Sequence, residues 1–524
     1  MSKLSNTVIN TLAEIVGKDN LKTDLASREL YSQDIWSTGE LADFVIFPHT
    51  ETEMCQIVKL AAQHKIPLNP RGAGVSYTSG FTPQHSGTGI VCFTRMNGVL
   101  DINEEDMYVT VQAGCTWKTL YETLKPLGLR TPFWGPLSGI YATIGGGLSQ
   151  NNAFLGAGTN GSSSGSILSL SVVLGDGSLV KTGSAGTQDS KPFFRDYGPD
   201  LTGLFLGDAG ALGFKTEITL RLIPTPHCEG WASYEFETAE DWAKAQSAVA
   251  KPAMACELFG FDPGLQKVRM VRASLASDLK SLKNVVTGQK GLLKGLKEGA
   301  KVAMSGRNFI DKAAYSLHLV VEGHSDPEIT AKLDYLDQIA KSHKAKSIEN
   351  SIPKLIRANP FMPLSNMLGP HGERWVPVHG IVPLSQGASC IAALDALFAR
   401  LKPHFDKFDI IYGYLTTNLA NNGFLIEPVF IWPEALMAIH HETVDKATLK
   451  RAKSFYPNPP ATALVKEART EVIKIMTSFG AAHFQIGRTY PFAQTRTPET
   501  LALLKAVKKA TDPDTIVNPG ALGI

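Results

Sequence analysis

Apolar positions in the first hundred residues follow two periods, that of a helix and that of a strand. Residues 51–64 carry one apolar face at helical spacing, made of Met54, Ile57, Val58, Ala61 and Ala62, which predicts an amphipathic helix. Short apolar runs at 44–48 and 66–69 predict strands on either side of it. The early chain is therefore predicted to form a strand–helix–strand unit.

The next stretch predicts antiparallel strands. Two pairs of runs alternate in polarity around polar turns, and these are 100–102 with 108–112 and 168–174 with 179–181. The second pair is joined by Gly175-Asp176-Gly177, a strong hairpin signal. Thr116 is placed to cap a helix that presents Trp117, Leu120, Tyr121 and Leu124. The first 225 residues thus predict an α+β domain of two subdomains.

The character of the chain changes twice after that. Pro224-Thr225-Pro226 stops the preceding strand, and longer helical patterns then alternate with strands. From about Thr477 the pattern changes again and ends in the turn Asn518-Pro519-Gly520. We divide the chain into residues 1–225, residues 226–476 and a closing segment, 477–524.

Composition describes an ordinary globular chain. The 524 residues are 43% hydrophobic and 19% charged, with a formal charge of +2, which gives no field to attract nucleic acid or anionic lipid. No apolar run reaches membrane-spanning length and the N-terminus lacks a signal-peptide pattern. The 6 cysteines lie far apart in the sequence. This spacing argues against a disulfide framework or a structural metal site. We expect a cytoplasmic protein with no metal, nucleic-acid or membrane partner.

Two glycine-rich runs, at 69–77 and 144–147, predict a bound phosphate ester, because glycine lets the backbone approach a ligand closely. The first run follows a strand and leads into no helix, so it differs from a Rossmann turn. We expect its turn amides and Arg71 to hold the phosphates. The candidate residues are Pro70, Arg71, Gly72, Ala73, Gly74, Val75 and Ser76.

The order of these motifs resembles the flavoprotein superfamily of vanillyl-alcohol oxidase and p-cresol methylhydroxylase. The segments that carry the resemblance are 70–74, 136–147, 197–205, 210–220 and 512–520. The resemblance implies FAD, a two-subdomain PCMH-type FAD-binding domain, an inserted α+β cap over the substrate, and a closing segment that returns to the FAD domain.

It also implies further cofactor-binding residues. Around the second run these are Pro136, Ser138, Thr143, Gly145, Gly146, Gly147 and Ser162. Gly213 and Ile218 are expected at the adenine end, and Asn518 in the closing turn. The serine-rich run 160–166 has the composition of a flexible linker, but its place after a glycine loop favours wrapping the cofactor.

The cap strand 376–383 is the best place for a base, since His379 interrupts its apolar residues. A neutral imidazole there would accept a hydroxyl proton near neutral pH, and a core histidine bonded to backbone is the equal alternative. Tyr77 is a further candidate. Tyr412 and Tyr414 alternate on one side of a strand, where they line the pocket or simply pack.

The segment 479–488 departs from its relatives. The phenol-oxidising branch has a Tyr-Arg pair here, where this chain has Phe484-Gln485; the 2-hydroxy-acid branch has a histidine where this chain has Phe484. His483, Gln485 and Arg488 are candidates for the site, Arg488 for a substrate anion or a flavin oxygen. Trp375 aligns with the position at which the aryl-alcohol branch attaches its flavin, through a histidine or tyrosine in several family members, so we expect noncovalent FAD.

These residues predict an FAD-dependent oxidoreductase, oxidase or dehydrogenase, that oxidises an alcohol or benzylic-type carbon of an aromatic compound by hydride transfer. Alternatives are a 2-hydroxy-acid dehydrogenase and a flavin-binding electron-transfer subunit without turnover. The electron acceptor is oxygen, a cytochrome or a quinone, and a homo-oligomer is expected. The lysine-rich stretch 280–301 could dock an acidic acceptor, but a solvated helix is the favoured interpretation.

Overall fold

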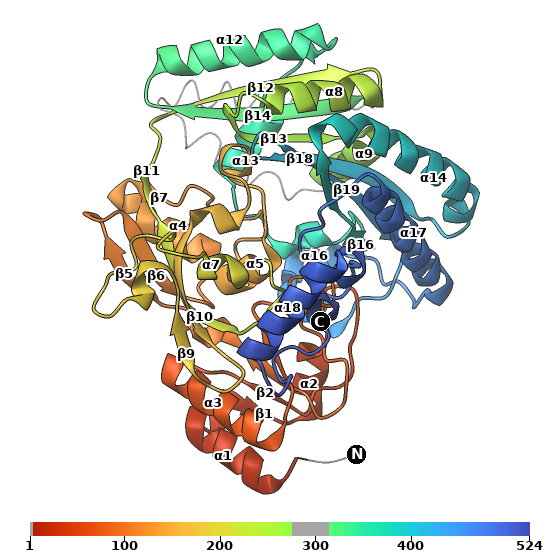
Figure 1. The fold of residues 1–524 in the computed structure, drawn as a ribbon. Helices are drawn as coiled ribbons and strands as arrows, with labels where there is room; N and C mark the ends of the chain where they lie inside the picture. The colour runs from red at the N-terminus through yellow and green to blue at the C-terminus, as the bar shows by residue number, and fades with distance from the viewer. Residues whose placement is uncertain (1–3, 275–313) are drawn as a thin grey trace.

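The computed structural model describes residues 4–274 and 314–524, and the lysine-rich stretch 280–301 lies outside these residues. Two bodies are visible (Figure 1): an N-terminal domain of short helices and two sheets, and a larger sheet with long helices on one side. The α+β class predicted from the sequence is confirmed.

The first sheet of the N-terminal domain follows the predicted strand–helix–strand order. The helix predicted at 51–64 forms with those bounds. Thr50 caps its start by accepting from the Glu53 N–H, and Lys65 ends it in a left-handed conformation at φ 52°. The sheet order is β1 (Leu21–Lys22), β2 (Phe44–Ile46), β4 (Gly89–Cys92), β3 (Leu68–Arg71), with α1 (Asn6–Val16), α2 (Leu25–Tyr31) and α3 (Glu51–His64) beside it.

The second sheet is antiparallel and includes both predicted strand pairs. Its order is β5 (Val99–Asn103), β6 (Tyr108–Gln112), β10 (Phe214–Arg221), β8 (Ile167–Val173), β9 (Leu179–Lys181). The strand β7 (Leu129–Arg130) pairs with β11 (Ile223–Pro224). Short helices join these strands, namely α4 (Trp117–Leu124), α5 (Ile144–Gln150), α6 (Ala157–Asn160) and α7 (Leu201–Leu204).

The second glycine run is not a loop, as the sequence suggested, but the first turn of α5. Thr143 supplies the cap that this helix needs, because its side chain accepts from the Gly146 N–H. Glycine is a poor helix former, so the helix depends on the cap and on burial of Ile144 and Leu148.

An antiparallel sheet of eight strands forms the cap. The order is β15 (Lys346–Ser347), β12 (Cys228–Phe236), β14 (Tyr315–Gly323), β13 (Ala255–Phe261), β18 (Ile411–Leu419), β19 (Gly423–Trp432), β16 (Arg374–Pro377), and β17 (Gly380–Pro383) also pairs with β19. The strand predicted at 376–383 is therefore two short strands, interrupted at 378–379. Smaller helices lie around this sheet, namely α9 (Pro263–Ser274), α13 (Ser351–Ala358), α15 (Ala438–Thr443) and α16 (Lys446–Arg451).

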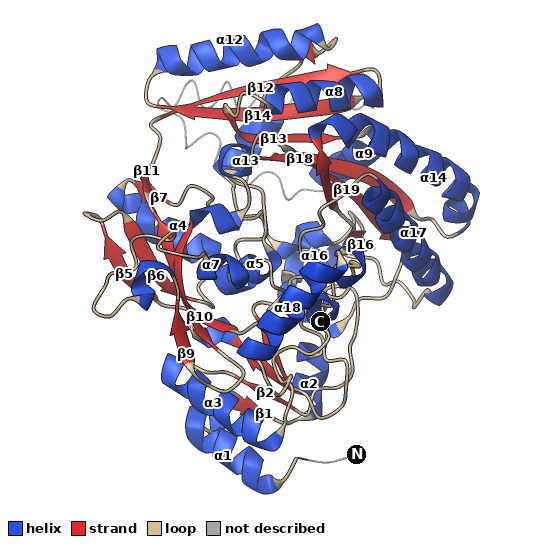
Figure 2. Cartoon of the chain, viewed as in Figure 1, coloured by secondary structure: helices blue, strands red, loops and turns tan. Residues whose placement is uncertain are grey.

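Long helices cover one face of the cap sheet (Figure 2): α8 (Ala239–Ala250), α12 (Asp326–Ser342), α14 (Gly387–Lys407) and α17 (Pro459–Ser478). Strand β19 shows the two faces of the cap sheet clearly, because successive side chains of a strand point to opposite faces. Phe424, Ile426, Phe430 and Trp432 pack under the helices, in the core of the cap. Leu425, Glu427, Val429 and Ile431 point to the other side. We call this other side the inner face.

The inner face packs on the N-terminal domain. Phe259, Phe261 and Leu415 share an apolar cluster with Trp134, Phe154 and Leu155, and Leu419 and Leu425 share another with Ala153 and Phe484. The proposed division at 225/226 lies between β11 and β12, and that at 476/477 lies near the end of α17. Both boundaries stay proposals.

After α17 the chain runs back to the N-terminal domain, where α18 (Pro498–Thr511) precedes a bridge between Val517 and Leu68. Asp512 fixes this end by accepting the N–H groups of Ile516 and Val517. In the two described ranges no helix combines the length and the hydropathy needed to span a bilayer. The same residues hold no cluster of three or more His, Cys, Asp or Glu arranged to bind a metal ion.

Candidate functional site

The two glycine-rich segments abut each other. A Cβ atom built on Gly72 would overlap Thr143 Oγ1, and one built on Gly146 would lie 3.9 Å from the Gly72 Cα. A side chain at residue 72 would therefore push the segments apart, and one at residue 146 would fill the contact between them. The sequence placed both in one binding site, and the structure brings them together.

The first segment offers unused backbone donors. Within the described residues, no protein acceptor takes the N–H groups of residues 73–76, and Gly74 is held at φ +79°. A row of free amides in a turn is an anion-binding arrangement, as a pyrophosphate requires. The second segment differs, because Ile144 and Gly145 donate to the carbonyls of Cys115 and Ala113. Its glycines serve close approach and not donation.

Arg71 lies beside these amides. Its guanidinium stacks 4.4 Å above the Tyr31 ring and 5.5 Å from the Phe81 ring, while its Nη1 reaches the Gly72 carbonyl at 3.4 Å. A Cβ atom on Gly74 would overlap the guanidinium. The cation is thus placed over the turn whose amides are free.

Buried polar atoms without a partner follow the same two segments. In the described part of the chain they include Arg71 Nε, Gln150 Oε1, Asn151 Oδ1, Asn152 Oδ1 and Ser163 Oγ. Each such atom costs about 1–3 kcal/mol unless a partner is present. A polar ligand between the segments would supply these partners, so the residues fit a bound dinucleotide. In the serine-rich run it is the Ser163 hydroxyl that lacks a partner among the described residues. The hydroxyl of Ser162, the residue predicted from the sequence, instead lies 2.9 Å from Ser164 Oγ.

Other predicted cofactor residues are occupied within the protein. The Ser138 carbonyl accepts from Tyr141 and Ala142, and the Pro136 carbonyl accepts from Gly139. Ile218 is fully buried in β10, and a side chain on Gly213 would meet Val172. Val75 packs against the core of the N-terminal domain.

A second group of residues lies on the inner face of the cap, around a histidine and a glutamate. Pro377 pairs with Val429 and Gly380 with Ile426, so no residue is inserted between β16 and β17. His379 therefore lies opposite Glu427. The Val378 N–H donates to the Pro428 carbonyl, which makes 379 and 427 a non-hydrogen-bonded pair. Side chains of such pairs share a face and lie close together.

Glu427 is the ionisable group that sequence reasoning missed. Apart from His379, the residues beside it on the inner face include the apolar Leu415, Leu425 and Val429. No hydrogen bond or ion pair to the carboxyl is found among the described residues. Burial raises its pKa from 4.5 to about 7. A carboxyl with this pKa can take and release a proton near neutral pH.

His379 is fixed by two side chains of the closing segment. Its backbone N–H and its Nδ1 lie 2.8 Å and 2.9 Å from the Tyr490 hydroxyl, and its carbonyl accepts from His483 Nδ1 at 3.0 Å. Burial, then the charges of His483 and Arg469, lower the His379 pKa to about 3. His379 is therefore a neutral ring and a weak proton acceptor, and its role as the base stays a prediction.

Phe484 and Gln485 join this cluster to the N-terminal domain. The Phe484 ring lies 4.1 Å from the His379 ring. The Gln485 N–H donates to the Gln150 carbonyl at the end of α5, 2.7 Å away, and Gln485 has φ +50°. His379, His483 and Gln485 are thus brought together as predicted, with Tyr490 added.

Arg488 lies apart and acts as a clamp between segments. Its Nη1 donates to the carbonyls of Ser79 and Gly80 at 2.8 and 2.9 Å, and its Nη2 to Asn518 Oδ1 and the Pro519 carbonyl at 2.6 and 2.9 Å. The Asn518 amide in turn donates to Gly80 and Ala209. Only Arg488 Nε is left for a substrate anion.

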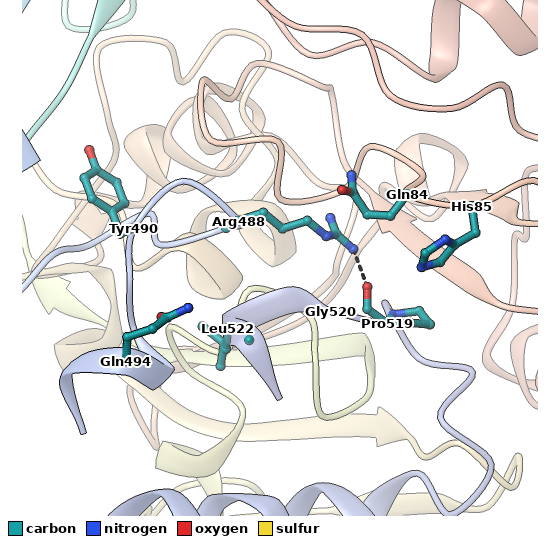
Figure 3. Close-up of a pocket in the computed structure, with 10 residues that line it drawn as sticks. Gln84, His85, Arg488, Tyr490, Gln494, Pro519, Gly520 and Leu522 are labelled. Atoms are coloured by element: carbon teal, nitrogen blue, oxygen red, sulfur yellow. Dashed lines mark hydrogen bonds between the residues drawn. The ribbon is translucent and has the colours of Figure 1, made fainter. Parts of the chain in front are cut away.

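A cavity of about 400 Å³ lies beside this clamp, lined by Gln84, His85, Arg488, Tyr490, Gln494 and the closing residues. Figure 3 shows Arg488 directed at Pro519, with the Tyr490 hydroxyl pointing away from the clamp. Burial lowers the pKa of Arg488 to about 10. The side chain is committed to holding the closing turn.

Tyr77 meets the site through its backbone. Arg469 of α17 donates from Nη2 to the Tyr77 carbonyl at 3.2 Å and stacks 4.3 Å over the Trp36 ring. No carboxylate pairs with Arg469 among the described residues, and burial lowers its pKa. Like Glu427 and Tyr490, Arg469 carried no local motif. Its only sequence signal was an arginine on the apolar face of a helix.

Tyr412 and Tyr414 lie on the helix-covered side of β18. The Tyr414 hydroxyl donates to Asp395 of α14 at 2.9 Å, and the Tyr412 ring lies 4.5 Å from the Phe398 ring. Their place in the alternation puts them on the face opposite Leu415 and Glu427. They share one side, as expected, but it is the packed side and not the pocket.

The geometry defines a class: a dinucleotide-binding domain of two glycine-rich segments, closed by a sheet that carries the Glu427 carboxyl, for which no partner is found among the described residues. Comparison with known proteins agrees. The FAD binding domain family matches residues 42–183, and the C-terminal domain of FAD linked oxidases matches residues 487–522.

Curated relatives match about half of this chain. Glycolate oxidase subunit GlcD of Bacillus subtilis is 31% identical over 224 residues, 43% of this chain and 46% of that protein. Mitochondrial D-lactate dehydrogenase [cytochrome] 1 of Saccharomyces cerevisiae is 31% identical over 283 residues, 52% of this chain and 46% of that protein. The chain spans about half the length of these relatives.

Solved structures resemble the whole fold. p-Cresol methylhydroxylase with substrate bound superposes with a TM-score of 0.74 at 18% identity, over 99% of this chain and 96% of that one. 4-Ethylphenol oxidase from Gulosibacter chungangensis gives 0.69 at 17% identity, over 100% and 98%. These structures share the fold of this chain, whose residues 42–183 match the FAD binding domain family, and FAD is its cofactor.

Proposed function

We propose that this protein oxidises an alcohol or benzylic-type carbon of an apolar, preferably aromatic, compound. The observation that carries the proposal is the unpaired Glu427 carboxyl on the apolar inner face, with its pKa raised to about 7. When bound, FAD accepts the hydride that leaves the substrate carbon. The proton of the substrate hydroxyl goes to Glu427.

The cofactor is proposed to lie between the glycine-rich segments. The amides of residues 73–76 and Arg71 would hold its pyrophosphate, and the orphan oxygens of Gln150, Asn151, Asn152 and Ser163 would accept from its polar edges. The flavin is proposed to be noncovalent. Cofactor contacts of Ser162, Gly213 and Ile218 also stay predictions.

The substrate class is proposed from what the inner face offers. Leu415, Leu425 and Val429 lie beside Glu427, and Phe484 closes the cluster beside them. Arg488 is engaged by protein oxygens, and no ion pair to Glu427 is found in the described part of the chain. A buried phenolate or carboxylate without a partner costs several kcal/mol. Neutral alcohols are therefore proposed as better substrates than para-alkylphenols or small 2-hydroxy acids.

A second candidate is oxidation of a 2-hydroxy acid. Two observations favour it: the curated relatives are named for glycolate and D-lactate, and Arg469 lacks a carboxylate partner near His379. In this alternative Arg469 would leave the Tyr77 carbonyl to bind the substrate carboxylate.

The experiment is an anaerobic screen of flavin reduction with the purified protein. We expect a yellow protein with about one FAD per chain, whose flavin stays in solution after acid precipitation. Neutral aromatic alcohols should bleach it faster than p-cresol, vanillyl alcohol, D-lactate or glycolate. A colourless protein that cannot be reconstituted with FAD would contradict the proposal at its base.

The decisive variant is Glu427→Gln. It should retain FAD but slow flavin reduction roughly 100-fold or more, the usual scale for losing a general base. Glu467→Gln, on the exposed side of α17, is the matched control and should reduce normally. Equal rates in both variants would remove Glu427 from the mechanism. Bleaching by no compound would favour the electron-transfer alternative.

Three further properties stay predictions: the electron acceptor (oxygen, a cytochrome or a quinone), the cytoplasmic location and the homo-oligomer. The yeast relative is named as mitochondrial.

A further inference from the structure

The Tyr490 hydroxyl meets two nitrogens of the same residue. It lies 2.8 Å from the His379 backbone nitrogen and 2.9 Å from His379 Nδ1. The backbone nitrogen carries a hydrogen and donates, so the hydroxyl oxygen is the acceptor in the first bond. The hydroxyl hydrogen is left for Nδ1.

No other acceptor competes for this hydrogen. Tyr490 is 5% exposed, its ring stacks 4.4 Å from the His483 ring, and its hydroxyl has no third partner among the described residues. If Nδ1 carried the imidazole proton, the hydroxyl hydrogen would be buried without an acceptor, at about 1–3 kcal/mol. Nδ1 is therefore the acceptor, and a neutral ring carries its proton on Nε2.

The groups around the ring determine its charge. His483 lies under the His379 carbonyl and Arg469 of α17 is close enough to act on the ring, and positive charge on either group disfavours protonation of His379. Glu427, opposite on β19, acts in the other direction when ionised. Burial is the largest effect, so the ring is neutral and holds a single proton.

We propose that Tyr490 is a positioning residue that fixes His379 in its Nε2–H form, so that His379 donates a hydrogen bond into the site. The donation to a substrate oxygen rests on the proposed function, whereas the tautomer does not. Because His379 and Glu427 are opposite residues on one face, a substrate hydroxyl would accept from His379 Nε2 while giving its proton to Glu427.

The first test is nitrogen-15 NMR of histidine-labelled holoprotein, with the His379 signals identified by their loss in His379→Gln. Between pH 6 and 8 we expect a bare Nδ1 and a protonated Nε2. Tyr490→Phe should shift the ring toward the Nδ1–H form. A protonated Nδ1 in the unmodified protein would overturn the proposal, and so would an unchanged tautomer in Tyr490→Phe. If that variant does not fold, the unmodified protein still decides.

The second test compares two isosteres. The glutamine amide nitrogen lies near the position of Nε2, and the asparagine amide nitrogen near that of Nδ1. His379→Gln should reduce its flavin within about 10-fold of the normal rate, and His379→Asn roughly 100-fold or more slower. The reverse order would overturn the donor role. If no alcohol reduces the flavin, the proposed function is wrong. The NMR experiment still tests the tautomer of His379, because that measurement does not depend on a substrate.

Discussion

The glycine-rich segments of the N-terminal domain and the inner face of the cap use different parts of their residues. The first site is built from backbone: free amides at residues 73–76, a positive φ at Gly74, and close approach of Gly72 to Thr143. The second is built from side chains, Glu427 and His379, which the register of β19 with β16 and β17 makes neighbours.

The use of backbone in one site and of side chains in the other determines which residues each site requires. A backbone site needs glycine at fixed local spacing and tolerates little else. A side-chain site needs only the right residue at the right register position, in surroundings that shift its pKa. The N-terminal domain therefore specifies the cofactor, and the cap specifies what the cofactor meets.

The largest expected effect is on the backbone site. Gly74→Leu should abolish FAD retention, because its side chain would overlap the Arg71 guanidinium in the turn that offers free amides. The control is Gly87→Leu, since Gly87 has φ +85° but nothing within 4 Å of a built Cβ. Both changes strain the backbone alike, so only the collision differs. The measurement is the flavin content of the two purified variants. Equal flavin content in both would mean that Gly74 is not part of the FAD-binding site.

The sequence could predict the first site because its signals are local. The helix at 51–64, the hairpin at Gly175-Asp176-Gly177 and the glycine runs each lie within a few residues. Glu427 could not be found this way, because its importance depends on pairing with a residue in a distant strand. For Tyr412 and Tyr414 both interpretations stayed open for a related reason: alternation showed that they share a side, but not which side the helices cover.

The second largest effect is expected at the ion pairs that join the N-terminal domain to the cap, which we call the joint. Arg357 of α13 pairs with Glu322 and lies 3.2 Å from Glu257, both in the cap, while Arg130 of the N-terminal domain pairs with the same Glu322. All four side chains are largely buried. Arg357→Ala leaves two carboxylates without this partner and should cost about 3–5 kcal/mol.

Urea unfolding measures this loss, with Lys402→Ala as the control. Lys402 pairs with Asp406 on the exposed side of α14, with both side chains 61% exposed, so that change should cost only about 0–1 kcal/mol. Similar losses in both variants would mean that the joint contributes no more than a surface ion pair.

A smaller effect tests the environment of the side-chain site. The pKa of Glu427 is raised from 4.5 to about 7, so the folded protein binds an extra proton between these values. Its stability therefore falls as pH rises through this window. Glu427→Gln does not titrate and should be more stable than the unmodified protein by about 1–3 kcal/mol at pH 8.

The advantage should shrink toward zero at pH 5, where Glu427 is protonated in the folded chain. Urea midpoints at pH 5, 6.5 and 8 follow the trend, with Glu467→Gln as a flat reference. If the difference in stability between Glu427→Gln and the unmodified protein did not change with pH, the pKa of Glu427 would not be raised. The inner face would then be more exposed to solvent than its apolar residues indicate.

The smallest expected effect separates the two sides of the cap sheet. Tyr412 packs against Phe398 on the helix side, and its hydroxyl has no partner among the described residues. Tyr412→Phe should therefore leave flavin reduction unchanged and stability within about 0.5 kcal/mol. Tyr414→Phe, which loses the bond to Asp395, should cost about 1 kcal/mol of stability and also leave reduction unchanged. If either variant slowed flavin reduction tenfold, the helix side would be coupled to the site and the division between the two faces would fail.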